Sequence, residues 1–210
     1  RSEGNPFFIE EIIKTLVEKA IVSVKQGRLA IQSEKLEAGV PETLQGVILA
    51  RIDRLEDRIR EVLLNASVIG REFLRPILEQ IVQKKIDVKG GLKELESLEL
   101  VFEKEEAKEL EYLFKHYLIQ EVAYNTLLQK KRKQLHGLIA QAIEKLYVER
   151  LEEFYEVLAF HYEKAEQWEK AADYLARAGR KMRETFTQEE SRAFSDRKDA
   201  ALKQLFASEA

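Results

Sequence analysis

Hydrophobic residues recur every three or four positions along most of this chain, which is the spacing of amphipathic helices. The pattern predicts a first helix at Pro6, capped by Asn5, and a second one opened by Pro41. Two more helices are predicted around 59–69 and 73–82. The remaining ones are expected at about 87–98, 117–127, 130–147, 151–165, 168–183 and 188–206. The fold class is therefore mainly α.

Short alternating segments interrupt this helical pattern. Apolar residues on either side of Gln26-Gly27 predict a small β-hairpin near 21–31. Two further strands are predicted at 100–103 and 110–115, on either side of a charged tip. Three helices followed by two such strands is the order of a winged-helix domain with a small β-wing.

The C-terminal helices have the spacing of a helical repeat. Apolar residues fall at the positions that pack two helices together in a tetratricopeptide unit of about 34 residues. They are Leu158, Ala159, Tyr162, Ala171, Leu175 and Ala178. A second unit is half present, because Ala193 fits its pattern and Asp196 does not. We expect the start of a repeat array.

Charge and composition exclude several classes of function. The 35 basic residues nearly balance the 38 acidic ones, so the net charge of −3 provides no general attraction to nucleic acid or anionic membranes. The absence of cysteine excludes disulfides and thiolate metal sites, and fits a reducing cytoplasm. No apolar run has the length of a membrane span, and we expect no signal peptide. We expect a cytoplasmic protein with no membrane contact. Because the chain begins with Arg1 and its only methionine is Met182, we also expect a piece of a longer protein.

His116 lies where the predicted strand 110–115 meets the predicted helix 117–127. At this position a histidine can meet a phosphate, because a helix N-terminus supplies free N–H groups and partial positive charge. The alternative is a histidine that only caps the helix or lies at the surface.

The order of the motifs resembles the back half of a STAND-type signalling ATPase, AAA-related and NB-ARC-like. It is most similar to the bacterial "predicted ATPase" modules that are often joined to cyclase, kinase or transcription-factor domains. The motifs that carry the resemblance are Gly4–Glu11, Val40–Leu44, Ile52–Leu55, Ala66–Phe73 and Phe114–Tyr124.

The resemblance implies a nucleotide site shared with a separate P-loop core. In that family a lid proline packs on adenine and a winged-helix histidine contacts the ADP β-phosphate, which matches Pro6 and His116 here. Tyr117 stands where related proteins have aspartate. The chain has no Walker-type glycine-rich loop, so ATP or ADP with Mg²⁺ would be bound by the core, and we expect no catalysis, cofactor or metal site in this chain itself.

On this reading the chain divides into three parts. Residues 1–54 are a helical lid piece with the small hairpin, residues 55–128 are the winged helix, and residues 129–210 are a linking helix and the start of the repeats. The function implied is the regulatory part of a nucleotide-switched signalling ATPase, which closes over nucleotide bound by the upstream core and relays to partners.

Two alternatives come from the same residues. The chain could be a protein–protein interaction scaffold, with Tyr155, Tyr162 and Trp168 on a partner surface of the repeats. It could also be a winged-helix DNA reader, but the predicted helix 87–98 carries three acids and only two lysines, and phosphate contacts need a basic face.

The other polar candidates have structural interpretations. Glu10 and Glu11 are expected to be first-turn charges, and the basic run 130–133 to be the solvated start of a helix. His136 and His161 lack the helical spacing of a metal pair and are expected to pack between helices.

Overall fold

The computed structural model describes residues 6–18, 22–25, 28–31, 43–105, 109–185 and 188–208. The cap predicted at Asn5, the turn at Gln26-Gly27 and the helix start at Pro41 lie outside these residues. Helices account for most of the described chain, which confirms the mainly α fold class.

The helices are close to their predicted positions. They are α1 (Pro6–Glu18), α2 (Leu44–Asp53), α3 (Asp57–Ile69), α4 (Arg75–Ile81), α5 (Val88–Ser97), α6 (Tyr117–Thr126), α7 (Gln129–Leu146), α8 (Tyr155–Lys164), α9 (Trp168–Thr185) and α10 (Gln188–Ser208). The strands are β1 (Val22–Lys25), β2 (Arg28–Ile31), β3 (Glu72–Leu74), β4 (Val101–Glu103) and β5 (Glu111–Phe114). The predicted hairpin is confirmed, because β1 and β2 pair antiparallel.

The small central sheet has three strands rather than the two predicted. Its order is β3-β5-β4, and both pairings are antiparallel. The prediction that Phe73 and Leu74 begin a helix was wrong, because residues 72–74 pair with 111–113 before α4 begins. The observed order α3–β3–α4–α5–β4–β5 agrees with the helices and wing expected from the sequence.

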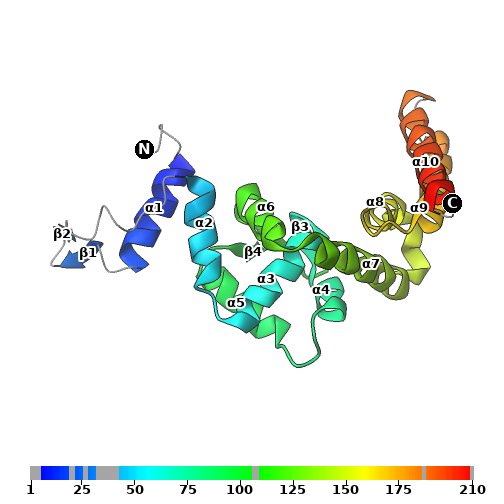
Figure 1. Cartoon of the computed structure of the whole chain (residues 1–210). Coiled ribbons are helices and arrows are strands. Elements are labelled where there is room, and N and C mark those ends of the chain that lie inside the picture. Colours follow the sequence, from blue (N-terminus) through cyan, green and yellow to red (C-terminus); the bar gives the residue numbers. More distant parts are fainter. Residues whose placement is uncertain are drawn as a thin grey trace.

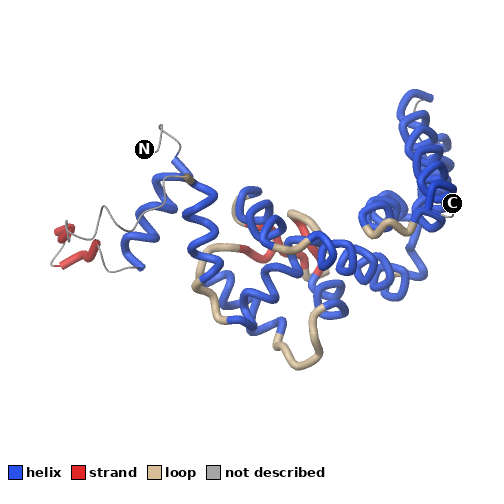
Figure 2. Tube along the Cα trace, viewed as in Figure 1, coloured by secondary structure: helices blue, strands red, loops and turns tan. Residues whose placement is uncertain are grey.

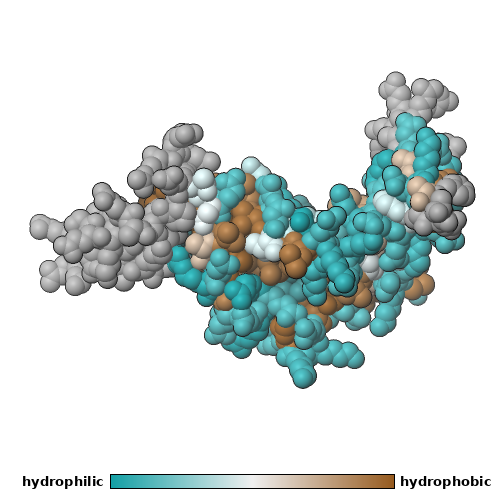
Figure 3. Space-filling view, viewed as in Figure 1, coloured by the Kyte–Doolittle hydropathy of each residue, from teal (hydrophilic) through white to brown (hydrophobic). Residues whose placement is uncertain are grey.

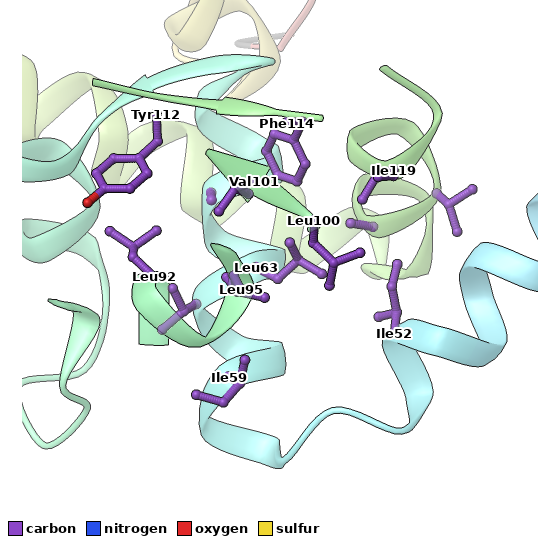
Figure 4. Packing of buried hydrophobic residues seen from close by; sticks show 14 of the residues in the cluster. Ile52, Ile59, Leu63, Leu92, Leu95, Leu100, Val101, Tyr112, Phe114 and Ile119 are labelled. Carbon is purple, nitrogen blue, oxygen red and sulfur yellow. The ribbon is translucent and has the colours of Figure 1, made fainter. Parts of the chain in front are cut away.

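A first hydrophobic core lies between this sheet and helices α2, α3, α5 and α6 (Figure 4). Phe73 stacks on Tyr112 with ring centroids 5.8 Å apart and meets Phe114 at 5.6 Å. Leu63 and Leu92 are completely buried beneath them. Each large apolar side chain buried in this way stabilises the fold by roughly 1.5–3 kcal/mol. These contacts fix the position of strand β5, which ends two residues before His116.

A second core lies between α7, α8, α9 and α10. The six residues expected to pack between the repeat helices are all buried in it: Leu158, Ala159, Tyr162, Ala171, Leu175 and Ala178. The single helix predicted at 151–165 was wrong, because residues 148–154 form a 3-10 helix with a kink at Arg150.

The described chain is elongated (Figures 1 and 2). Helix α1 and the β1–β2 hairpin lie at one end, the sheet lies in the middle, and α8, α9 and α10 lie at the other end. Helix α7 connects the middle to this second end. The surface seen in Figure 3 is mostly hydrophilic, with hydrophobic residues gathered in the middle of the molecule.

Candidate functional site

His116 caps helix α6, as the second of its two sequence interpretations expected. Its backbone is extended, with φ −139° and ψ 143°, and its Nδ1 accepts the N–H of Leu118 at 3.2 Å. The N–H of Ile119 donates to the His116 carbonyl at 3.0 Å. These two amide groups at the helix N-terminus are therefore already bonded, and His116 has to meet an anion mainly with its ring.

The His116 ring is suited to donate a hydrogen bond from Nε2. Burial lowers its pKa, the charge of Arg71 lowers it further, and Glu11 acts in the opposite direction. A neutral ring whose Nδ1 accepts a hydrogen bond carries its proton on Nε2. The half-buried imidazole thus combines one donor with the nearby positive charge of Arg71.

Helix α1 is attached close to His116 by a buried ion pair. Glu11 is completely buried, and its carboxylate binds the guanidinium of Arg51 on α2. Arg51 also donates to the carbonyl of Leu98 at 2.8 Å, at the end of α5. The expectation that Glu11 is only a first-turn charge was wrong, because tertiary packing places it in an interior.

A second, exposed group of charges joins α1 to the residue that precedes His116. Lys115 Nζ lies 3.1 Å from Glu10 and 2.6 Å from Glu99, and Lys14 binds both carboxylates. Hydrogen bonds from Lys115 and then Lys14 lower the pKa of Glu99 to about 2. Glu99 has a φ of 54°, a left-handed conformation that costs a non-glycine residue free energy. Four charges from three parts of the chain therefore meet beside the β5–α6 junction.

Pro6 is exposed at the first position of α1, the helix that carries Glu10 and Glu11. An exposed ring at this position fits packing against a planar base. These contacts attach the helix that begins with Pro6 to Lys115, which precedes His116.

The three aromatic residues expected on a partner surface differ in exposure. Tyr162 is completely buried, stacks on Tyr174 with centroids 5.7 Å apart, and accepts a hydrogen bond from Lys170 at 2.9 Å. It fills the second core and presents no surface to a partner in this structure. Tyr155 and Trp168 are half-buried, so each retains some accessible area.

The helix expected to read DNA in the alternative interpretation is α5. Its Leu92 and Leu95 are buried, while Lys89 and Lys93 are exposed. Glu94 lies on the same helix, 3.9 Å from Arg58. The mixed charge anticipated from the sequence is present, and it does not form a basic face.

The spacing of the histidines did not reveal a contact between two of them. The Nδ1 atoms of His136 and His161 are 2.8 Å apart, and His136 Nε2 lies 3.1 Å from the Tyr124 hydroxyl. Burial lowers the pKa of both rings, so both are neutral near pH 7. The interpretation of these histidines as packed between helices agrees with their burial.

Two comparisons with known proteins found no match. No family model matches the chain, and a search of curated proteins finds no similar sequence. The described part of the chain contains no group of three or more acidic residues and histidines that could hold a metal ion. None of the helices described is both long and apolar enough to span a bilayer.

Proposed function

We propose that this chain is the regulatory part of a nucleotide-switched signalling ATPase of the STAND type. In this proposal a P-loop core elsewhere in the protein binds ATP or ADP with Mg²⁺. Pro6 packs on the base and His116 donates from Nε2 to a phosphate oxygen. The chain supplies contacts and a movable helix, while the core holds the triphosphate.

The observation that carries the proposal is the connection between α1 and the β5–α6 junction. Lys115 joins Glu10 directly, and the buried pair between Glu11 and Arg51 fixes the same helix from beneath. Two elements linked in this way would act on a nucleotide as one unit. A nucleotide that favours one arrangement would then shift both contacts together.

Exposed apolar side chains on the same elements support a docking role for this region. Ile13 on α1 and Tyr117 on α6 are 53% and 52% exposed, and Leu49 on α2 is 39% exposed. Isolated apolar residues are ordinary at a surface, but these three lie on the helices that surround His116. They are the contacts that we assign to the nucleotide-binding core.

The switch requires the two nucleotides to bind the two arrangements with different affinity. Moving a population from 1:99 to 99:1 takes roughly 5.5 kcal/mol of differential binding. A hydrogen bond to a charged phosphate contributes about 1.5–3 kcal/mol. His116 alone is therefore insufficient, and the ion pairs of α1 have to break or re-form in the same transition.

The experiment that tests this proposal uses the protein containing the chain together with the segment encoded upstream of Arg1. After purification, the protein is denatured and its released nucleotide is separated and quantified. We expect close to one ADP per protein. Protein that folds, contains no nucleotide and binds no added ADP would contradict the proposal.

A further inference from the structure

A cavity of about 640 Å³ opens between α7, the turn from α8 to α9 and the last turns of α10. Its wall includes Tyr124, Arg132, His136, Lys164 and Trp168. Pockets for small molecules usually measure about 300–1,000 Å³ and combine aromatic walls with a few polar groups. Apart from Tyr124, which lies near the C-terminal end of α6, its wall comes from elements other than those that surround His116.

Both acidic side chains that line this cavity, Glu163 and Glu166, are already paired with cations. Lys133 forms an ion pair with Glu166, and Glu163 binds Arg197 at 2.6 Å. The remaining cations are Arg132 and Lys164, and no carboxylate among the described residues forms an ion pair with either of them. The cavity wall therefore has two positive charges that its own acids do not balance.

Arg132 has a donor directed away from the solvent with nothing bound to it. Its guanidinium lies over the Tyr124 ring, 4.8 Å from the centroid, and one terminal nitrogen lies 3.5 Å from Asn125 Oδ1. Its Nε is buried and has no hydrogen-bond partner among the described residues. Buried donors in native proteins are nearly always satisfied, so an acceptor at this nitrogen would complete the hydrogen bonding of Arg132.

The pKa of His136 shows that the charges of Arg132 and Lys164 both reach this part of the cavity wall. After burial, the charges of Lys164 and Arg132 are the causes that lower its pKa. Its Nε2 is bonded to the Tyr124 hydroxyl, which fixes the ring in the cavity wall.

From this geometry we infer that the cavity binds a small organic phosphate that carries a planar ring. A phosphate monoester bears nearly two negative charges at neutral pH, which matches the two unbalanced cations. Arg132 and Lys164 hold the phosphate oxygens, and the half-buried Trp168 provides a surface for the ring. This site is separate from the nucleotide contacts proposed for Pro6 and His116.

The chain contains its own reporter for a binding test. Trp168 is its only tryptophan and lies in the cavity wall, so its fluorescence reports on occupancy. The probes are AMP, inorganic phosphate and adenosine, each titrated into the whole chain, with calorimetry as a second measurement. We expect saturable binding of AMP, weaker binding of phosphate, and little binding of adenosine.

Variants of Arg132 and Lys164 distinguish binding in this cavity from nonspecific attraction of anions to the protein. Lys164→Gln is at an exposed position and should weaken AMP binding about tenfold or more, since a charge-assisted contact is lost. Arg132→Lys keeps the charge but removes the Nε donor, and should also weaken binding. The matched control is Lys131→Gln, an exposed neighbour outside the cavity wall, which should leave affinity unchanged.

Three results would overturn the inference. The first is that protein with a native circular dichroism spectrum gives no saturable response to AMP. The second is that Lys131→Gln weakens AMP binding as much as Lys164→Gln does. The third is that adenosine binds as tightly as AMP. Phosphate binding as tightly as AMP would overturn the contact assigned to Trp168.

Discussion

The Glu11 carboxylate on α1 and the Arg51 guanidinium on α2 form an ion pair whose side chains are 1% and 5% exposed. Forty positions separate them in the chain. Arg51 also reaches the Leu98 carbonyl, so one guanidinium connects α1, α2 and the end of α5. The position of α1, and with it of Pro6, depends on charges that water does not screen.

Replacing Glu11 with glutamine should detach α1. Removal of one partner from a buried pair typically costs 3–5 kcal/mol, because the other charge stays buried without compensation. We expect a loss of about 3 kcal/mol in urea unfolding and faster proteolysis between α1 and α2. Glu10→Gln is the control, since an exposed pair contributes about 1 kcal/mol or less. Equal effects of the two variants would contradict the role given to Glu11.

The burial of His136 and His161 should make the protein sensitive to acid. Both pKa values are below the ordinary histidine value of about 6.5, so between these values the unfolded chain binds protons that the folded chain does not. Stability should therefore fall as the pH decreases below about 6.5, by up to about 1.4 kcal/mol per pH unit for each histidine. Urea unfolding from pH 7 to pH 4.5 measures this slope.

The variant His161→Phe should have a smaller slope, because one titrating group is removed. The difference between the two slopes isolates the histidine from the acids that titrate at lower pH. Identical slopes in the two proteins would show that His161 does not titrate as its burial requires.

The pKa of Glu99 should depend on Lys115. Its value of about 2 is caused first by the hydrogen bond from Lys115 and then by that from Lys14. Lys115→Gln should raise this pKa toward its usual range, with Lys14 keeping part of the shift. NMR titration of the Glu99 carboxyl carbon measures the change. Lys104→Gln removes a lysine that pairs with Glu72 and Glu111, and should leave Glu99 unchanged.

Two helical glycines should respond oppositely to alanine. A Cβ on Gly91 would lie 3.0 Å from the Cγ2 of Val62, which is completely buried in the first core. A Cβ on Gly137 would lie 3.0 Å from Gln167 Nε2, the end of a flexible side chain. We expect Gly91→Ala to lose about 1–3 kcal/mol and Gly137→Ala to gain up to about 1 kcal/mol. Thermal unfolding distinguishes these signs, and a gain at position 91 would contradict the packing described.

Sequence patterns were sufficient to predict the position of an element where its local periodicity and its tertiary packing agree. Helix α9 was predicted at 168–183 and spans residues 168–185, because Ala171, Leu175 and Ala178 recur on the side that packs against α8. Strand β3 was missed because it has three residues, and Phe73 and Leu74 also fit the spacing of the helix that follows.

The contacts that define the candidate sites depend on distances that sequence spacing does not encode. Glu11 and Arg51 meet only because α1 packs on α2, and the first-turn position of Glu11 suggested an exposed charge. His136 and His161 are 25 residues apart and lie on different helices. Arg132 looked like part of a solvated basic run, but Tyr124 holds it at a cavity.

The measurement that tests the central claim most directly is the dissociation rate of ADP from the protein in which we propose that this chain is joined to a nucleotide-binding core. His116→Asn is the decisive variant, because asparagine is a good helix N-cap and removes only the imidazole donor. The account predicts that ADP leaves about tenfold faster or more, as expected for the loss of a hydrogen bond to a charged phosphate. An unchanged rate in a variant that folds normally would contradict it and leave His116 as the cap of α6.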